Sequence, residues 1–251
     1  MLYIVVWLLF SFLMFRIAPK TSRYDKIMTY TLATGTRACS KTTLLSLLHR
    51  LFHNGAVIMA DTSDIINLHI KRKTPIGVQL EEFNEQKKSG KILPCDELVF
   101  EAIKQWVHAK SELQNVLHVL LAGSPRSPKQ CKLWKEHTPN LRVINIHAEP
   151  HEIEASVIHR QKITQAIRPD ESPESLRNAW QDYKNLVVPG LKVFNGQAKT
   201  ILRSQPMRVR LKETIDHIDV PENVRYRLHQ RLDTPNHPVS MDVDKLDGVT
   251  V

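Results

Sequence analysis

Hydrophobic and polar positions along the chain predict short strands that alternate with amphipathic helices. Five runs that are β-rich or continuously apolar predict strands, at 29–34, 57–60, 116–121, 141–146 and 200–202. The segments between them carry apolar residues at helical spacing; in 41–52 these are Leu44, Leu47, Leu48 and Leu51. Strands separated by helices are typical of an α/β domain with a parallel sheet.

Prolines and a glycine help to place the predicted helices. Pro150 and Pro173 each begin a helix, because the fixed φ of proline suits the first helical turn. Ser89-Gly90 interrupts another helix. The predicted helices are 41–52, 62–72, 78–89, 96–109, one that begins at 150, one from 173 to about 187, 207–218 and 221–231.

The first 27 residues form a hydrophobic N-terminal segment, of which 1–18 are almost wholly apolar. This run is short for a membrane span, which needs about 20 apolar residues, and no basic residue precedes it as in a signal peptide. Two interpretations stay open: the run is a membrane anchor, or the chain starts at Met28 rather than Met1. Basic residues after the run would hold an anchored body in the cytosol, so both interpretations predict a cytoplasmic body.

Composition and charge narrow the class of protein. With 42% hydrophobic and 24% charged residues, the chain is neither collagen-like nor wholly disordered. Residues 233–251 have two prolines and no periodicity, and predict a disordered acidic tail with four Asp and one Lys. The net charge of the whole chain is +9 and the tail contributes −3, so the body, residues 1–232, carries about +12. This charge suits nucleic acid, an acidic surface or a phosphorylated ligand.

Cysteine and histidine spacing predicts no resident metal. The three cysteines, at 39, 95 and 131, form no CxxC pair and no even disulfide set, which is typical of a reducing compartment. The histidines show no HExxH spacing. The sequence also lacks basic runs interleaved with aromatic residues, so we do not expect nucleic acid as a partner.

The most informative junction follows the first predicted strand. Residues 35–43 read GTRACSKTT, close to the phosphate-binding pattern GxxxxGK[ST]. In that pattern backbone N–H groups surround the phosphates, the lysine reaches the outer ones and the hydroxyl meets magnesium. Gly35, Lys41 and Thr42 stand at the required spacing, whereas Ser40 replaces the second glycine. The alternative is a glycine turn followed by an exposed lysine.

Two further segments supply candidate phosphate ligands. The segment 120–130 (LLAGSPRSPKQ) follows a strand, and ligands of open α/β sheets bind beyond the carboxyl ends of strands. There the planar fork of Arg126 suits a phosphate, and Gln130 offers an amide to a base edge. Further along stand three arginines, Arg160, Arg168 and Arg177. Such a group can neutralise a transferring phosphoryl group; the alternatives are a solvated turn and a solvated basic helix face.

Taken together and in this order, these segments resemble the adenylate kinase family of nucleoside monophosphate kinases over about 28–218. LLAGSPRSPKQ is similar to the family's LLDGFPRxxxQ, which is the most specific match. ADTSDII at 60–66 resembles its STGDLLR segment, and GKILPCDELV at 90–99 resembles its GxLVxxELV stretch. Residues 160–183 resemble its short lid.

The resemblance implies a three-layer α/β/α fold of the P-loop NTPase type over 28–220, with a five-stranded parallel sheet. It implies a helical hairpin at about 61–92 that binds the monophosphate and a short lid at about 160–172. Beyond the resemblance, the sequence predicts a C-terminal helix at 221–232. The implied reaction is magnesium-dependent transfer of the γ-phosphoryl of ATP to AMP or a related monophosphate. We expect the protein to act as a monomer.

The resemblance also implies roles for individual residues. Lys41 would hold the β- and γ-phosphates, with Thr42 near the magnesium. Arg126 would grip the AMP phosphate, and Gln130 would read adenine. The remaining implied ligands are Gly35, Ser40 and Thr43 for the nucleotide, Thr62 for the substrate, and Arg160 and Arg168 for the transition state.

Several positions depart from the family. Ser40 puts a side chain where the loop needs glycine, and Ala122 replaces the carboxylate that orders the water shell of magnesium. Asn67 replaces a phosphate-binding arginine, although Lys71 and Arg72 lie a turn further on, and Ala179 stands at the last lid arginine. Loss of one electrostatic stabiliser costs about 10²–10³ in rate. Two functions therefore stay open: a nucleoside monophosphate kinase, or a catalytically impaired nucleotide-binding protein that acts as a scaffold.

Overall fold

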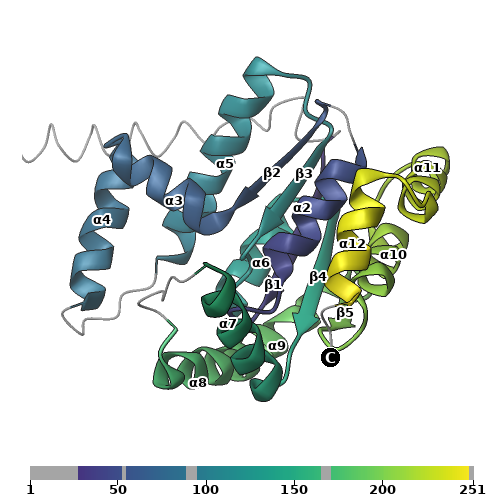
Figure 1. The fold of residues 1–251 in the computed structure, drawn as a ribbon. Coiled ribbons are helices and arrows are strands. Elements are labelled where there is room, and N and C mark those ends of the chain that lie inside the picture. The colour runs from purple at the N-terminus through teal and green to yellow at the C-terminus, as the bar shows by residue number, and fades with distance from the viewer. Residues whose placement is uncertain (1–27, 53–54, 89–94, 165–170, 249–251) are drawn as a thin grey trace, which may run out of the picture.

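The computed structural model describes residues 28–52, 55–88, 95–164 and 171–248. Its centre is a sheet of five parallel strands in the order β2-β3-β1-β4-β5 (Figure 1). The strands are β1 (Thr29–Gly35), β2 (Val57–Asp61), β3 (His118–Ala122), β4 (Leu141–His147) and β5 (Ala198–Leu202). The predicted α/β fold with a five-stranded parallel sheet is confirmed.

Helices connect these strands and follow the last one. Before β3 come α2 (Lys41–Phe52), α3 (Thr62–Lys71), α4 (Pro75–Lys88) and α5 (Asp96–Leu113). Between β3 and β5 lie α6 (Pro128–His137), α7 (Pro150–Thr164), α8 (Pro173–Asp182), the π-helical η1 (Tyr183–Val187), α9 (Val188–Gly190) and the 3-10 turn η2 (Leu191–Phe194). After β5 come α10 (Met207–His217), α11 (Glu222–Asp233) and α12 (Pro238–Gly248).

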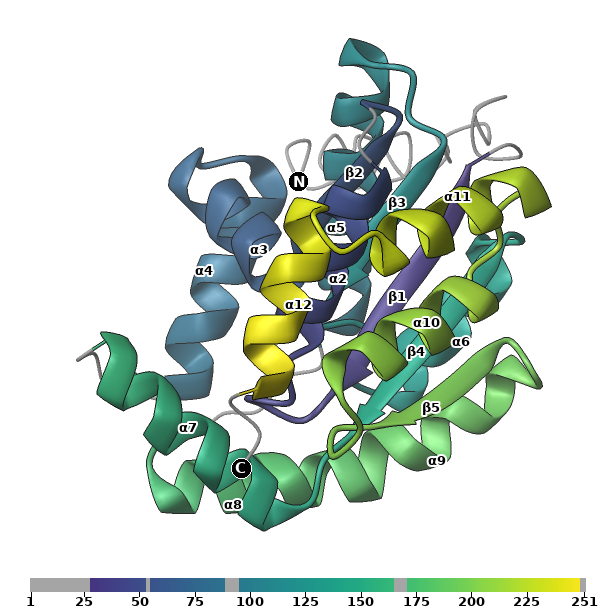
Figure 2. The same ribbon diagram turned by 45° about the vertical axis from the view of Figure 1, so that its right-hand side comes forward.

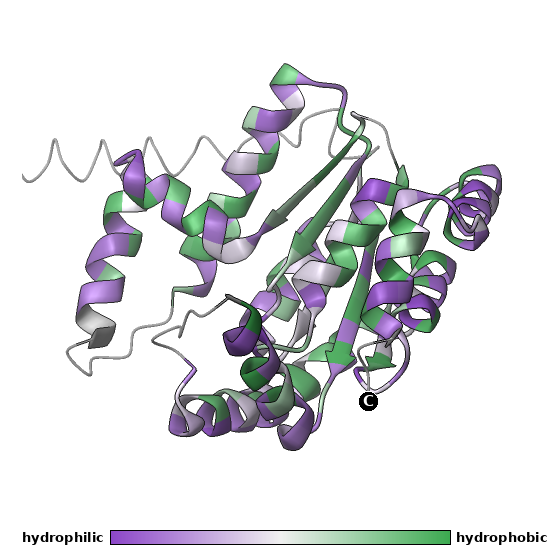
Figure 3. Cartoon of the chain, viewed as in Figure 1, coloured by the Kyte–Doolittle hydropathy of each residue, from purple (hydrophilic) through white to green (hydrophobic). Residues whose placement is uncertain are grey.

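Buried side chains alternate between the two faces of the sheet, because successive residues of a strand point to opposite sides. In β3, Leu120 and Ala122 belong to the core under α2, α10, α11 and α12. Val119 and Leu121 belong to the core under α5 and α6. Figure 3 shows mostly hydrophobic strands beneath helices with many hydrophilic residues. The chain therefore has three layers, α/β/α.

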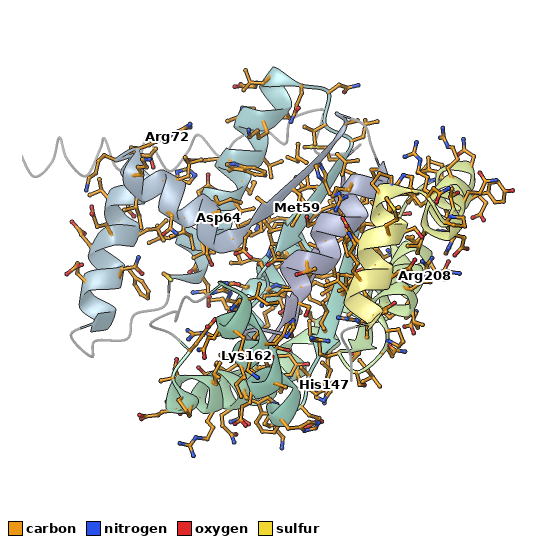
Figure 4. The ribbon with its side chains drawn as sticks, in the orientation of Figure 1. Met59, Asp64, Arg72, His147, Lys162 and Arg208 are labelled. Atoms are coloured by element: carbon orange, nitrogen blue, oxygen red, sulfur yellow. The ribbon has the colours of Figure 1, made fainter. Side chains whose placement is uncertain are left out.

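Two helical pairs flank the carboxyl ends of the strands (Figures 1 and 2). α3 and α4 follow β2 and pack against each other as a hairpin, in the range predicted as 61–92, of which 89–92 lie outside the described residues. α7 and α8 follow β4 and also pack together. The predicted lid at 160–172 falls here, and its residues 165–170 lie outside the described residues. Asp64 on α3 and Lys162 on α7 mark the two pairs in Figure 4.

The prediction of a disordered tail over 233–251 is wrong for Pro238–Gly248, which form helix α12 alongside α2 (Figure 2). Val239 and Val243, one turn apart, are buried in the core. The acidic residues that suggested a tail are hydrogen-bond and ion-pair partners of α10. The Asp247 carboxylate accepts backbone N–H groups at the first turn of α10, where a negative charge is favourable. Arg208, labelled in Figure 4, contacts Asp244 at 2.6 Å.

The N-terminal segment 1–27 lies outside the described residues, so the anchor and the start at Met28 both stay predictions. In the part of the chain that the structure describes, none of the helices combines the length and apolar character needed to cross a membrane.

His118 is a buried histidine at the start of β3. Its ring nitrogens lie 2.7 Å from the hydroxyl of Thr29 and 2.9 Å from that of Thr31. Burial lowers the pKa of His118 to about 4, whereas an unfolded histidine has a pKa of about 6.5. The neutral ring is therefore the folded form. Its contribution to stability is present above pH 6.5 and is lost as the pH falls towards 4, since the unfolded chain takes up the proton first.

We expect acidification from pH 7 to pH 5 to remove about 2 kcal/mol of unfolding free energy through His118 alone. Replacement of His118 by Gln removes this titration, so the variant should lose that much less over the same interval. Urea unfolding at both pH values measures the difference. Asn223→Gln, at an exposed residue of α11 that does not titrate, is the control for substitution alone and should keep the wild-type slope. Equal pH slopes in wild type and His118→Gln would contradict the prediction.

Candidate active site

The chain between β1 and α2 makes a tight turn that needs glycine at its start. Gly35 has a φ of +143°. A Cβ at this position would lie 2.5 Å from the carbonyl oxygen of Ile146 on β4. No side chain fits so close to a backbone atom, so glycine alone is accommodated. The glycine that opens the predicted phosphate-binding pattern therefore has a structural reason in this chain.

Two other residues of this turn hold a left-handed backbone without being glycine. Ala38 has a φ of 56° and Ser40 a φ of 69°. This conformation costs an L-residue about 1–2 kcal/mol. Ser40 therefore strains the position where the pattern has glycine, and Ala38 is a second strained position that was not predicted from the sequence. Strain of this kind clusters at functional sites, where the surrounding structure holds it in place.

Groups that favour an anion gather where this turn meets α2. The helix begins at Lys41, its first-turn N–H groups have no intrahelical partner, and its first turn has no acidic residue. The Lys41 ammonium donates to the carbonyl oxygen of Thr36 at 2.9 Å, which holds the cation against the turn. Among the described residues, the buried Thr36 hydroxyl has no hydrogen-bond partner. This combination is typical of an anion site at a helix N-terminus.

A carboxylate lies directly beside the start of α2. The Thr42 hydroxyl donates to Oδ2 of Asp61 at 3.0 Å, and Oδ1 of Asp61 accepts the backbone N–H of Ser63 at 2.9 Å. Asp61 is the last residue of β2 and is in register with Ala122 of β3. Asp61 is not among the site residues predicted from the sequence. Its available signal was an acidic residue at the end of a buried strand, where ligands of parallel sheets bind.

Arg126 lies close to this carboxylate. Its Nε donates to the carbonyl oxygen of Gly123 at 2.6 Å, and its Nη2 lies 3.5 Å from the hydroxyl of Ser63. A Cβ on Gly123, whose φ is +85°, would lie 2.8 Å from that guanidinium and 3.5 Å from Oδ1 of Asp61. Arg126 reaches the surface, yet protein atoms around the guanidinium desolvate it and lower its pKa. Asp61 opposes this shift and Arg37 adds to it.

Two of the predicted substrate ligands are hydrogen-bonded inside the protein. Gln130 is 6% exposed; its amide oxygen accepts the backbone N–H of Arg126 at 2.8 Å, and its amide nitrogen donates to Asp96 at 2.9 Å. Thr62 is 2% exposed and donates to the carbonyl oxygen of Ala122 at 2.9 Å. In this geometry Gln130 and Thr62 hold the segments that carry Arg126 and Asp61, and neither side chain is free to meet a ligand.

The predicted lid arginines are only partly brought to the site. Arg160 of α7 pairs with the buried Glu171 just before α8, Arg177 is exposed on α8, and Arg168 lies outside the described residues.

The turn 35–40 contacts α8, since Arg37 donates to the Ser175 hydroxyl at 2.8 Å. A cavity of about 320 Å³ lies between them and is lined by Arg37 and by residues of α8 that include Ala179. Thr43 instead borders a cavity of about 540 Å³ between α2 and α12.

The residues at this edge suit a magnesium ion that arrives with a nucleotide. Across the described ranges, no group of three or more His, Cys, Asp or Glu side chains is placed to hold a metal ion. Magnesium in phosphate sites is usually bound by one or two protein oxygen ligands together with substrate phosphates and water. The Thr42 hydroxyl and the Asp61 carboxylate are hard oxygen donors of this kind, 3.0 Å apart.

Comparison with protein-family models and with curated proteins identifies no relative of this chain. The geometry and chemistry of the site are therefore the basis for assigning a function.

Proposed function

We propose that this protein is an adenylate kinase-like nucleoside monophosphate kinase that transfers the γ-phosphoryl group of ATP to AMP or a related monophosphate. One observation carries the proposal: the strained turn at the start of α2, the Asp61 carboxylate and Arg126 meet at the carboxyl edge of a five-stranded parallel sheet. Ligands of open α/β sheets bind at this edge, and the groups gathered here suit phosphates.

The ATP phosphates would lie on the turn 35–40 and the first turn of α2. Backbone N–H groups at the helix start supply donors that need no rearrangement, and Lys41 supplies the positive charge for the outer phosphates. The unpartnered Thr36 hydroxyl is a further donor within the same turn. In this assignment a phosphate oxygen replaces the Thr36 carbonyl as the partner of the Lys41 ammonium.

The monophosphate would be held by Arg126. Its planar guanidinium matches a phosphate bidentately, and its surroundings already desolvate the cation, so an anionic partner is favoured. The α3–α4 hairpin follows directly on Asp61 and borders this position. Gln130 fixes the backbone of Arg126, so we assign it a positioning role within the substrate site.

The chain's own groups would act by positioning and electrostatics, with no covalent intermediate. Magnesium bound with ATP would be held beside the Thr42 hydroxyl at the start of α2, and it would neutralise charge on the phosphate oxygens. Arg160 and Arg168 are proposed to stabilise the charge that develops during transfer. In the structure Arg160 is held by its ion pair with Glu171.

A second function, a nucleotide-binding scaffold with little turnover, is favoured by Ala122 and by the Arg160–Glu171 pair. Melting of the full chain with ATP, AMP and a dinucleotide bisubstrate mimic tests both functions. Mimic at about 100 times its Kd should raise the melting temperature by roughly 5–10 °C. A rise without ADP formation would select the scaffold, whereas a melting temperature unmoved by all three nucleotides would exclude both functions.

A further inference from the structure

The paired strands β2 and β3 end with a carboxylate on β2 and none on β3. Asp61 and Ala122 are register partners at these ends. Ala122 is fully buried, and its carbonyl oxygen is occupied by the Thr62 hydroxyl. The family that this chain resembles has an acidic residue at the Ala122 position. This chain has its negative charge at the same sheet edge, but on the neighbouring strand β2, at Asp61.

Both carboxylate oxygens of Asp61 are directed by short contacts. Oδ1 caps α3 through the backbone N–H of Ser63, and Oδ2 accepts the hydroxyl of Thr42 on α2. An N-cap needs only the contact with Ser63. The contact with Thr42 additionally joins Asp61 to α2, the helix proposed to bind the ATP phosphates. Thr42 follows Lys41, so the carboxylate stands beside the proposed position of the ATP phosphates.

We propose that Asp61 is the magnesium-directing carboxylate of this protein, moved from β3 to β2, and that it acts together with Thr42. The inference rests on the proposed function, because the metal arrives with ATP. A carboxylate beside polyphosphate repels it when no metal is present, and attracts the complex once a divalent cation lies between the two anions. Asp61 should therefore make ATP binding strongly dependent on magnesium.

Asp61→Asn separates this role from the structural one. Asn is as good an N-cap as Asp, so the α3 cap and the folded stability should be kept, while the negative charge is removed. Asp219→Asn is the matched control, since Asp219 is exposed between α10 and α11 and its replacement changes the net charge equally. Urea unfolding of each full-length variant checks that the fold is intact.

The test is the ATP affinity of each full-length protein by calorimetry, with excess Mg²⁺ and with EDTA. The ATP affinity in Mg²⁺ divided by the ATP affinity in EDTA should fall by about 10–100-fold in Asp61→Asn. Affinity in EDTA should stay equal or rise, because a repulsive charge is gone. Asp219→Asn should keep the wild-type ratio. A purely structural Asp61 would lower both affinities together or neither.

An unchanged ratio in Asp61→Asn would overturn the inference, and this outcome is independent of whether phosphoryl transfer occurs. If ATP binds with a ratio that depends on Asp61 but no ADP forms, the inference stands and the kinase function fails. If ADP forms while the affinity ratio is the same in Asp61→Asn and in the wild type, the kinase function stands and the inference fails. Absence of ATP binding in the wild type under both conditions overturns both.

Discussion

Replacement of Lys41 by Ala is expected to lower kcat for ADP formation by at least 10²–10³-fold. The ammonium lies against the turn 35–40 and contacts the Thr36 carbonyl at 2.9 Å, so a small movement brings it to the outer phosphates of a nucleotide. The charge on those phosphates changes during transfer, and the loss should therefore appear mainly in kcat. A coupled assay of ADP formation from ATP and AMP with magnesium measures the effect.

Lys192→Ala is the matched control for this variant, because Lys192 is exposed on η2, which precedes β5. It should keep wild-type turnover. The melting temperature of Lys41→Ala without nucleotide should stay close to that of the wild type, since the substitution removes a single partly buried hydrogen bond. Wild-type kcat in Lys41→Ala would contradict the assignment of this turn as the ATP site.

The largest expected effect on stability is at Trp134. This side chain is 2% exposed, meets Phe100 edge-on at a centroid distance of 4.9 Å, and donates from its indole N–H to the Ser124 hydroxyl at 2.8 Å. Replacement by Ala leaves a large cavity and a buried hydroxyl without its partner. We expect a loss of about 3–5 kcal/mol of unfolding free energy, measured by urea denaturation.

Trp106→Ala provides the comparison, because Trp106 on α5 is only partly buried against the same core. Its replacement should lower the free energy of unfolding by clearly less than Trp134→Ala does. Because Ser124 stands two residues before Arg126, Trp134→Ala should also weaken AMP binding when measured below its melting temperature. Equal losses of stability in the two tryptophan variants would contradict the packing described for α6.

Much of the fold was predictable because its signals are local. The buried parallel strands appear as short apolar runs, and the Leu-rich segment 41–52 predicts α2 at the observed residues. Helix α12 was missed because it buries only a few apolar side chains, such as Val239 and Val243, among acidic residues typical of a tail. Its helical state depends on contacts with α10, as between Asp247 and the first-turn N–H groups.

The residues of the candidate site likewise divide into those that local sequence patterns predict and those that depend on contacts between distant elements. Gly35 and Lys41 were found because they stand at a strand end and a helix start within one short pattern, and Arg126 because it follows a strand in a second short segment. Asp61 was missed because its importance comes from register with β3 and contact with Thr42, 19 residues away in the chain. The burial of Thr62 and Gln130 likewise depends on partners in other elements, which spacing along a sequence does not report.

The proposed transfer of a phosphoryl group is tested most directly by the formation of ADP from ATP and AMP by the full chain. The assay should compare AMP with CMP, UMP and GMP, with magnesium and with EDTA, in wild type and Lys41→Ala. We predict ADP formation that requires magnesium, is fastest with AMP, and falls at least 10²-fold in Lys41→Ala. Wild-type turnover no higher than that of Lys41→Ala with every monophosphate would contradict the kinase function.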